Sequence, residues 1–127
     1  MTDNSSIKVL VVDDEPFVAM SVVAILDDSD IKAEVVGSGE EALELVGCSR
    51  YDIALVDLRL PAMQGDELIP KLHEIQPDMK FVIHTGSTWF ELTDGLKNAG
   101  VKREHLLYKP VVDLVEIVRV VCELAEC

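Results

Sequence analysis

Short apolar runs alternate with longer amphipathic segments along the whole chain. The short runs are rich in β-branched residues, and their length and composition are typical of strands. We predict strands over 8–12, 33–36, 52–57, 80–84 and 105–108. Their apolar residues follow one another without alternating polar positions, which is typical of a parallel sheet with helices on both faces.

The longer segments are predicted helices over 16–26, 38–46, 65–75, 89–100 and 111–126. Ser38 followed by Glu41 three residues later is a helix-capping pattern. In the third helix, Leu68, Leu72 and Ile75 share the face expected to be buried. Regular alternation of strand and helix implies right-handed crossovers, so the predicted fold is α/β, a (βα)5 doubly wound five-stranded parallel sheet.

Chemically reactive side chains follow four of the five predicted strands. Asp13 and Asp14 follow the first strand, Asp57 ends the third, Thr85 follows the fourth and Lys109 follows the fifth. In a doubly wound sheet, ligands bind outside the carboxyl ends of the strands. We therefore expect three carboxylates, one hydroxyl and one amine to meet at a single edge.

This set of groups is suited to magnesium-dependent phosphoryl transfer. Carboxylate oxygens are hard ligands of the kind that Mg²⁺ prefers, and a bound cation offsets the repulsion among the acids. Lys109 and Thr85 can bind phosphoryl oxygens. Asp57 is then available as a nucleophile, since a carboxylate can form an acyl phosphate.

The composition and net charge of the chain limit the kinds of partner that it is expected to bind. The formal net charge of −13 argues against a nucleic-acid surface and against docking on an anionic membrane. It fits a divalent cation or a basic partner, although acidic surfaces also serve solubility. The three cysteines match no metal-ligand spacing, and neither a signal peptide nor a membrane-length apolar run is present. We expect one cytoplasmic domain over 1–127, with its core at about 7–125.

Four stretches, VVDDEP, ALVDLRLPAMQG, the Thr-Gly-Ser after the fourth strand and YKP, occur in the order and spacing of a known family. The chain resembles the receiver domain of two-component response regulators, including chemotaxis response regulators. The resemblance implies a flavodoxin-like fold with strand order 2-1-3-4-5. It also implies that a histidine kinase or phosphotransfer protein phosphorylates the chain, which then acts on a downstream protein that the sequence does not identify. Such a protein is a switch rather than an enzyme acting on an external substrate.

The resemblance also assigns roles to individual residues. They are the phospho-acceptor Asp57; the Mg²⁺ ligands Asp13, Asp14, Asp57 and the Arg59 backbone carbonyl; the phosphoryl-binding pair Thr85 and Lys109; and the tuning residues Arg59 and Ser87. The Arg59 side chain could cover the phosphoryl group or point to solvent, and we favour solvent because surface ion pairs are weak. Glu15 is expected to face solvent at a helix start, and His84 to be a buried histidine with its hydrogen bonds satisfied.

The chain departs from the family pattern before the lysine. The family usually has an aromatic residue three positions before the lysine, and here that position is Leu106. We hypothesise that the loop from Thr85 to Phe90, which carries Trp89, moves on phosphorylation without an aromatic rotor.

The last predicted helix has an unusually wide apolar surface flanked by Val115 and Val120. These positions are either scattered apolar surface residues or part of a homodimer interface formed by 89–100, 105–108 and 111–126.

Two other functional classes fit the sequence less well. A magnesium-dependent phosphohydrolase with an aspartate nucleophile is the alternative, but it would need an Asp-x-Asp motif at the first strand and a cap domain. Here Asp13 and Asp14 are adjacent, and no segment is long enough for a cap. A flavodoxin-like FMN binder would need a Ser/Thr/Gly phosphate loop, and the acidic DDE run would repel the phosphate.

Overall fold

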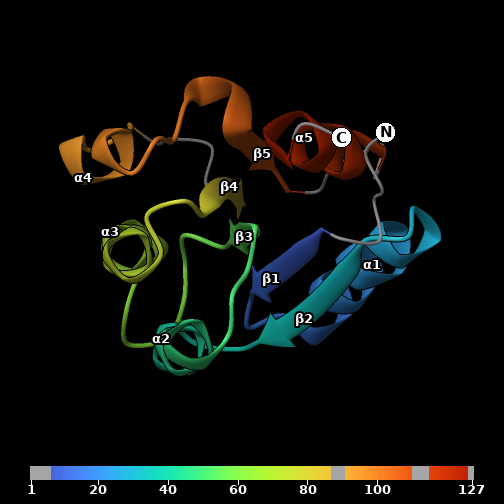
Figure 1. Cartoon of the computed structure of the whole chain (residues 1–127), viewed down its shortest axis with the longest axis horizontal. Coiled ribbons are helices and arrows are strands. Elements are labelled where there is room, and N and C mark those ends of the chain that lie inside the picture. The colour runs from blue at the N-terminus through green and yellow to red at the C-terminus, as the bar shows by residue number, and fades with distance from the viewer. Residues whose placement is uncertain (1–6, 87–90, 110–114, 126–127) are drawn as a thin grey trace.

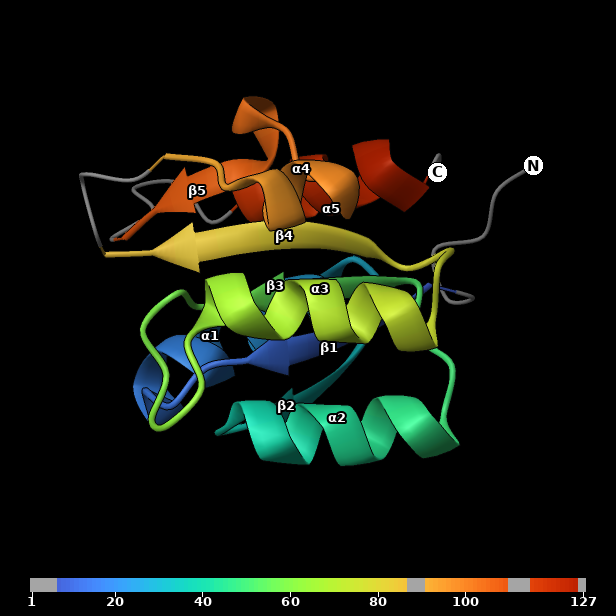
Figure 2. The same cartoon turned by 90° about the vertical axis from the view of Figure 1, so that its left-hand side faces the viewer.

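The computed structural model describes residues 7–86, 91–109 and 115–125, and they form a three-layer α/β fold (Figure 1). One parallel sheet has the strand order β2-β1-β3-β4-β5, which confirms the predicted fold class and order. Its strands are β1 (Lys8–Val12), β2 (Lys32–Val36), β3 (Ile53–Val56), β4 (Lys80–Thr85) and β5 (Leu106–Tyr108). All run in the same direction, so their carboxyl ends meet at one edge (Figure 2).

The helices are α1 (Pro16–Asp28), α2 (Gly39–Cys48), α3 (Gly65–Ile75), α4 (Asp94–Asn98) and α5 (Val115–Ala125). α1 and α5 cover one face of the sheet, and α2, α3 and α4 cover the other (Figure 1). No helix among the described residues is both long and apolar enough to cross a lipid bilayer.

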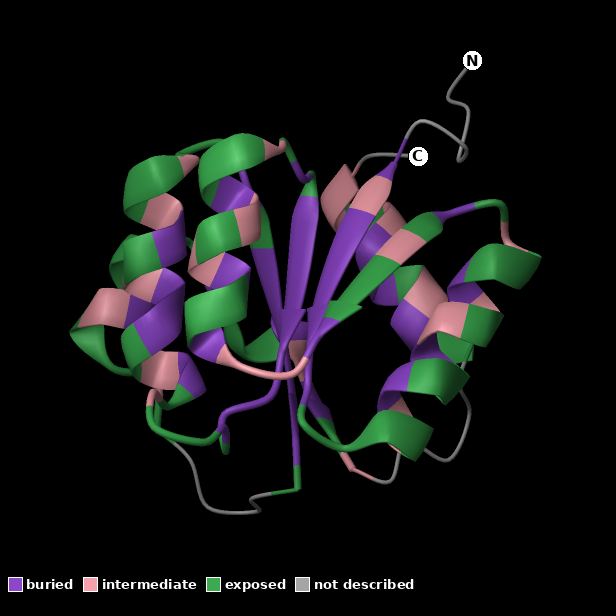
Figure 3. Cartoon of the chain, turned by 90° about the horizontal axis from the view of Figure 1, so that it is seen from below, coloured by how far each residue is buried: buried purple, intermediate pink, exposed green. Residues whose placement is uncertain are grey.

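Both faces of the central strands are buried, which explains their unbroken apolar sequence (Figure 3). In β1, Val9 and Val11 join a core under α1 and α5, whereas Leu10 and Val12 join a second core under α2 and α3. Polar residues within these strands would enter one core or the other, so the chain places them at the strand ends.

The predicted start of α2 is confirmed in detail. The Ser38 hydroxyl accepts a hydrogen bond from the Glu41 amide at 3.3 Å. The Glu41 carboxylate in turn accepts one from the Gly37 amide at 2.9 Å. Both bonds satisfy amides that have no partner within the helix.

The helix predicted over 89–100 is shorter than expected. It begins at Asp94, where the Thr93 hydroxyl caps it by accepting a hydrogen bond from the Leu96 amide at 3.2 Å. Residues 91–93 lie outside the helix, and 89–90 lie outside the described residues. The chain then passes through a short 3-10 helix, η2 (Arg103–His105), before β5.

The predicted burial of two residues, Val120 and Ile75, was wrong. Val120 is 0% exposed and packs in the core with Ile117 and Val121, so it cannot lie on an accessible interface. Val115 is 58% exposed and does lie on the surface. Ile75, expected to be buried, is largely exposed because it is the last residue of α3.

Candidate functional site

Asp13 and Asp57 lie side by side just beyond the carboxyl ends of β1 and β3. The Asp57 amide donates to the Val12 carbonyl at 2.9 Å, which extends the parallel ladder past the end of β3. Val12 pairs with Val56 in the register of these strands, so the two aspartates are neighbours. Both side chains are buried, and Asp57 is only 4% exposed.

Lys109 joins these two carboxylates. Its amide donates to the Thr85 carbonyl at 2.7 Å, which fixes the backbone at the end of β5. Its ammonium donates to Asp13 Oδ2 at 2.9 Å and to Asp57 Oδ2 at 3.1 Å, and it lies 3.7 Å from Glu15 Oε2. The predicted convergence of strand ends is therefore present for Asp13, Asp57 and Lys109.

Burial and hydrogen bonding set the protonation states of Asp57 and Lys109. Burial raises the pKa of Asp57, although hydrogen bonds from the Arg59 amide and from Lys109 act in the opposite direction. Burial alone would lower the pKa of Lys109, but its hydrogen bonds to Asp13 and Asp57 outweigh that effect and raise the pKa. The lysine therefore stays charged and serves as the counterion of the two acids.

Four carboxylates form a cluster that fits a hard divalent cation. One oxygen from each of Asp13, Asp14, Glu15 and Asp57 can be chosen so that all lie within 4.8 Å of one another. Oxygen ligands of this kind suit Mg²⁺, and the exposed Asp14 and Glu15 leave room for the water that Mg²⁺ retains. Glu15 is exposed as predicted, yet it belongs to the cluster, which the sequence interpretation had not expected.

Arg59 contributes its backbone to the site. Its amide donates to Asp57 Oδ1 at 3.1 Å, and its side chain is exposed to solvent, the orientation favoured from the sequence. Coordination of a metal by its backbone carbonyl stays a prediction.

Gly65 is a site-shaping residue that the sequence interpretation missed. A Cβ at this position would lie 2.5 Å from the Asp57 carbonyl oxygen and 2.9 Å from Leu58 Cα. The loop after β3 folds back here, and the Gly65 amide donates to the Leu58 carbonyl at 2.9 Å. The only sequence signal was a glycine at the start of a predicted helix, and that does not reveal the close approach.

Thr85 is the last residue of β4 and is fully buried. Its partner on β5 is Tyr108, whereas Leu106 pairs with Ile83 two residues earlier. An aromatic residue therefore does lie next to Thr85, although not at the position usual in the family. Ser87, Trp89 and Phe90 lie outside the described residues, so their roles, like that of Leu106, stay predictions.

His84 does not have the satisfied hydrogen bonds that we predicted. It is 4% exposed, and its Nε2 has no hydrogen-bond partner among the described residues. Burial, reinforced by the positive charge of Lys109 and opposed by Asp13, lowers the pKa of His84 to about 4. The imidazole is therefore neutral at physiological pH.

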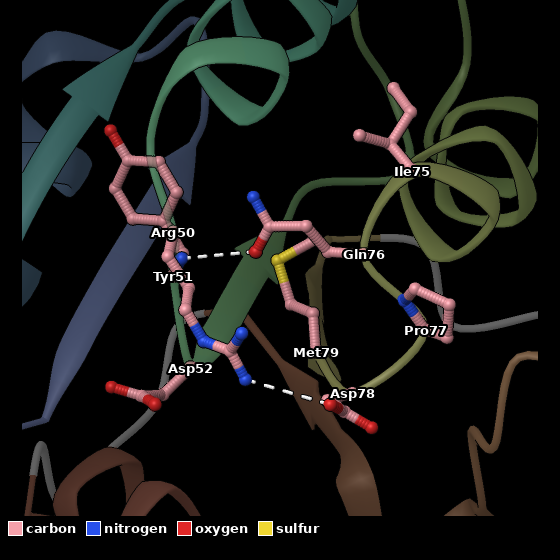
Figure 4. Close-up of a pocket in the computed structure, with 8 residues that line it drawn as sticks. All are labelled: Arg50, Tyr51, Asp52, Ile75, Gln76, Pro77, Asp78 and Met79. Atoms are coloured by element: carbon pink, nitrogen blue, oxygen red, sulfur yellow. Dashed lines mark hydrogen bonds and ion pairs between the residues drawn. The ribbon is translucent and has the colours of Figure 1, made fainter.

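A separate hollow of about 140 Å³ lies at the opposite end of the sheet (Figure 4). It is lined by Arg50, Tyr51, Asp52, Ile75, Gln76, Pro77, Asp78 and Met79. The Gln76 amide group is fully engaged there: its nitrogen donates to the Val46 and Ser49 carbonyls, and its oxygen accepts from the Tyr51 amide. These bonds tie the end of α2 to the end of α3, so the residues around the hollow have a structural role.

Comparison with known proteins finds one family. The family model described as "Response regulator receiver domain" matches residues 9–121. The chain is 31% identical over 106 residues to the uncharacterized transcriptional regulatory protein YesN of Bacillus subtilis, a match covering 81% of this chain and 28% of YesN. It is 30% identical over 103 residues to the transcriptional regulatory protein CutR of Streptomyces coelicolor, covering 81% of this chain and 46% of CutR. The chain thus spans less than half of these relatives.

Solved structures are similar over nearly the whole chain. A CheY-like response regulator receiver domain protein from Methanospirillum hungatei has a TM-score of 0.84 and 30% identity, and the match covers 94% of both chains. A response regulator from Burkholderia pseudomallei, solved with a phosphorylated aspartic acid, a calcium ion and citrate, has a TM-score of 0.79 and 25% identity. That match covers 94% of this chain and 69% of the Burkholderia chain.

Proposed function

Because the chain belongs to the receiver domain family of response regulators, we propose that it is a phospho-acceptor switch with Asp57 as the acceptor. The donor is a phosphohistidine on a histidine kinase or a phosphotransfer protein. The observation that carries this assignment is the position of Asp57: it is buried at the carboxyl edge of the sheet, hydrogen-bonded to Lys109 and part of a carboxylate cluster with a geometry that could hold a cation. The chain modifies itself, so we do not assign it an external substrate.

The chemistry is one phosphoryl transfer. A carboxylate oxygen of Asp57 attacks the phosphorus, the phosphorus–nitrogen bond to the donor imidazole breaks, and its electron pair returns to the ring. Lys109 binds one phosphoryl oxygen, and the Thr85 hydroxyl donates to another. Asp13, Asp14 and Asp57, together with the Arg59 carbonyl, would hold Mg²⁺, which when bound supplies positive charge against the phosphoryl oxygens.

Phosphorylation of Asp57 changes the hydrogen-bond partners of the Lys109 ammonium. In the described state, its ammonium joins Asp13 to Asp57. An acyl phosphate adds charged oxygens that compete for this ammonium, and the backbone bond between Lys109 and Thr85 links any shift at β5 to β4. Output then passes through protein contacts on the β5 and α5 side, to a downstream partner or to a second copy of the chain.

A direct labelling experiment tests this function. The purified chain is incubated with acetyl phosphate or beryllofluoride, with and without Mg²⁺, alongside Asp57→Asn. We expect one acid-stable, base-labile phosphoryl group that requires Mg²⁺ and is absent in Asp57→Asn. Turnover of a small phosphate ester without a stoichiometric intermediate would instead support the phosphohydrolase alternative.

A further inference from the structure

His84 lies in the same row of the sheet as the two buried aspartates. Val12, Val56 and Ile83 are in register across β1, β3 and β4, and His84 pairs with Leu107 on β5. One residue beyond that register, Asp13, Asp57, His84 and Leu107 form the next row. His84 is therefore the neighbour of Asp57 on the side of β5.

The row shares one face of the sheet. Side chains alternate along a strand, and Val11, Leu55 and Val82, each two residues earlier, all belong to the core under α1 and α5. Leu107 belongs to the same core, so Lys109, two residues later, lies on that face as well.

Lys109 must cross β4 to make its contacts. It extends from β5, whereas Asp57 lies on β3 and Asp13 on β1, and adjacent strands are about 4.8 Å apart. The lysine stem therefore passes over the end of β4. Side chains alternate along β4, so His84 is the last residue of β4 in this row, and Thr85 ends the strand one residue later.

We propose that His84 is a positioning residue for Lys109: its buried ring supports the lysine stem as it crosses β4 and holds the ammonium at Asp57 and Asp13. A role for His84 in phosphoryl transfer rests on the proposed function, whereas the packing of His84 against the Lys109 stem does not. The ring, whose Nε2 has no hydrogen-bond partner among the described residues, is uncharged and can lie beside the ammonium without repelling it. The aliphatic stem also packs on the flat ring.

The first test observes the lysine itself. Nitrogen-detected or proton-detected NMR of the Lys109 ammonium, in the metal-free and phosphate-free chain, reports its hydrogen bonds through slow proton exchange. We expect His84→Ala to speed this exchange about tenfold, because the stem loses its support. His84→Leu, which restores a side chain of similar bulk, should stay within about threefold of wild type. Unchanged exchange in His84→Ala, or equally fast exchange in His84→Leu, overturns the proposal.

The second test connects the position to the reaction. The rate of Asp57 phosphorylation by acetyl phosphate is measured for His84→Ala alone, Lys109→Met alone and both together. We expect His84→Ala to lower the rate about tenfold in the wild-type background and to have no further effect in the Lys109→Met background. An equal effect in both backgrounds overturns the proposal, because His84 would then act independently of the lysine.

Two controls keep the outcomes separate. Circular dichroism reports whether each variant is folded. If His84→Ala is unfolded, His84→Val takes its place, and we expect it to change the ammonium exchange and the phosphorylation rate in the same direction by a smaller factor. If wild type is not phosphorylated at all, the proposed function fails, whereas the ammonium exchange still decides whether His84 positions Lys109.

Discussion

Lys109 separates two buried carboxylates that would otherwise repel each other. Its ammonium contacts both Asp13 and Asp57 at hydrogen-bond distance and is itself mostly shielded from solvent. A buried charge that loses its partner destabilises a fold far more than a surface charge does. The residue proposed to bind the phosphoryl group is thus also part of the stability of the resting state.

Lys109→Met should lower the free energy of unfolding by about 2–4 kcal/mol at neutral pH, because two buried carboxylates lose their counterion. Added Mg²⁺ should restore more stability to this variant than to wild type, since a cation replaces the missing charge. Urea denaturation with and without MgCl₂ measures both effects. Lys71→Met, which removes an exposed pair with Glu67 at 3.9 Å, should change stability by less than about 0.5 kcal/mol.

The neutral His84 should make stability depend on pH. Its pKa is about 4 in the folded chain and 6.5 ordinarily, so between these values the unfolded chain binds a proton that the folded chain does not. Stability should therefore fall as the pH drops through this window, by about 2 kcal/mol between pH 7.5 and pH 5 from this residue alone. Subtracting the pH profile of His84→Leu from that of wild type isolates this contribution. A flat difference would show that the pKa of His84 is not lowered in the folded chain.

The connection from β3 to α3 requires a glycine at position 65, because a side chain there would clash with the Asp57 backbone. Gly65 brings the start of α3 against the Asp57 carbonyl, and this packing fixes the backbone that carries the Asp57 carboxylate, the proposed acceptor. The start of α3 therefore helps to set the geometry of Asp57.

Gly65→Ala should displace the Asp57 backbone, because the new methyl group would lie 2.5 Å from its carbonyl oxygen. We expect phosphorylation by acetyl phosphate to slow at least tenfold, with a loss of stability of about 2 kcal/mol. The matched control is Gly47→Ala in α2, where a Cβ meets nothing within 4 Å. That variant should be more stable by about 0.5–1 kcal/mol and should react normally.

α1 carries exposed apolar residues beside the candidate site. Phe17 and Met20 on its outer surface are 85% and 67% exposed, and Phe17 follows the acidic cluster by two residues. An exposed aromatic residue next to a reactive centre is a suitable anchor for the protein that delivers the phosphoryl group.

Phe17→Ala should therefore slow phosphoryl transfer from a phosphorylated histidine phosphotransfer protein about tenfold. The rate with acetyl phosphate should not change, because that donor needs no protein contact. Ile75→Ala removes an exposed apolar residue at the other end of the sheet and should affect neither rate. Equal slowing with both donors would indicate damage to the site instead of lost docking.

At the scale of the whole molecule, the exposed apolar residues near β5 and α5 bear on self-association. Tyr108 and Val115 are both exposed there, and Val115 replaces the buried Val120 as the residue to test. If a homodimer forms through this surface, Val115→Lys should weaken it at least tenfold in sedimentation with beryllofluoride and Mg²⁺. A wild-type chain that stays monomeric at high concentration, with or without the phosphate mimic, would exclude the dimer.

The sequence predicted the whole sheet because strand composition and helix periodicity are local properties, and the site followed because parallel strand ends must meet. Other features depended on three-dimensional packing. The apolar width of the last helix did not reveal that the sheet side includes Val120. The close contact of Gly65 with the Asp57 backbone and the missing partner of His84 depend on the folded path of the chain and on packing, which local sequence patterns do not report. The start of α4 at Asp94 depended on the Thr93 cap, which the sequence interpretation did not single out.

The counterion of the acidic site comes later in the sequence than the acids that it neutralises. Lys109 lies 52 positions after Asp57 and 96 after Asp13. During synthesis from the amino terminus, β1 and β3 leave the ribosome well before the lysine that neutralises their ends. We therefore expect a nascent chain to keep these strand ends apart, or to rely on a divalent cation from the surrounding solution, until β5 arrives. Closure of the acidic edge then follows the arrival of β5.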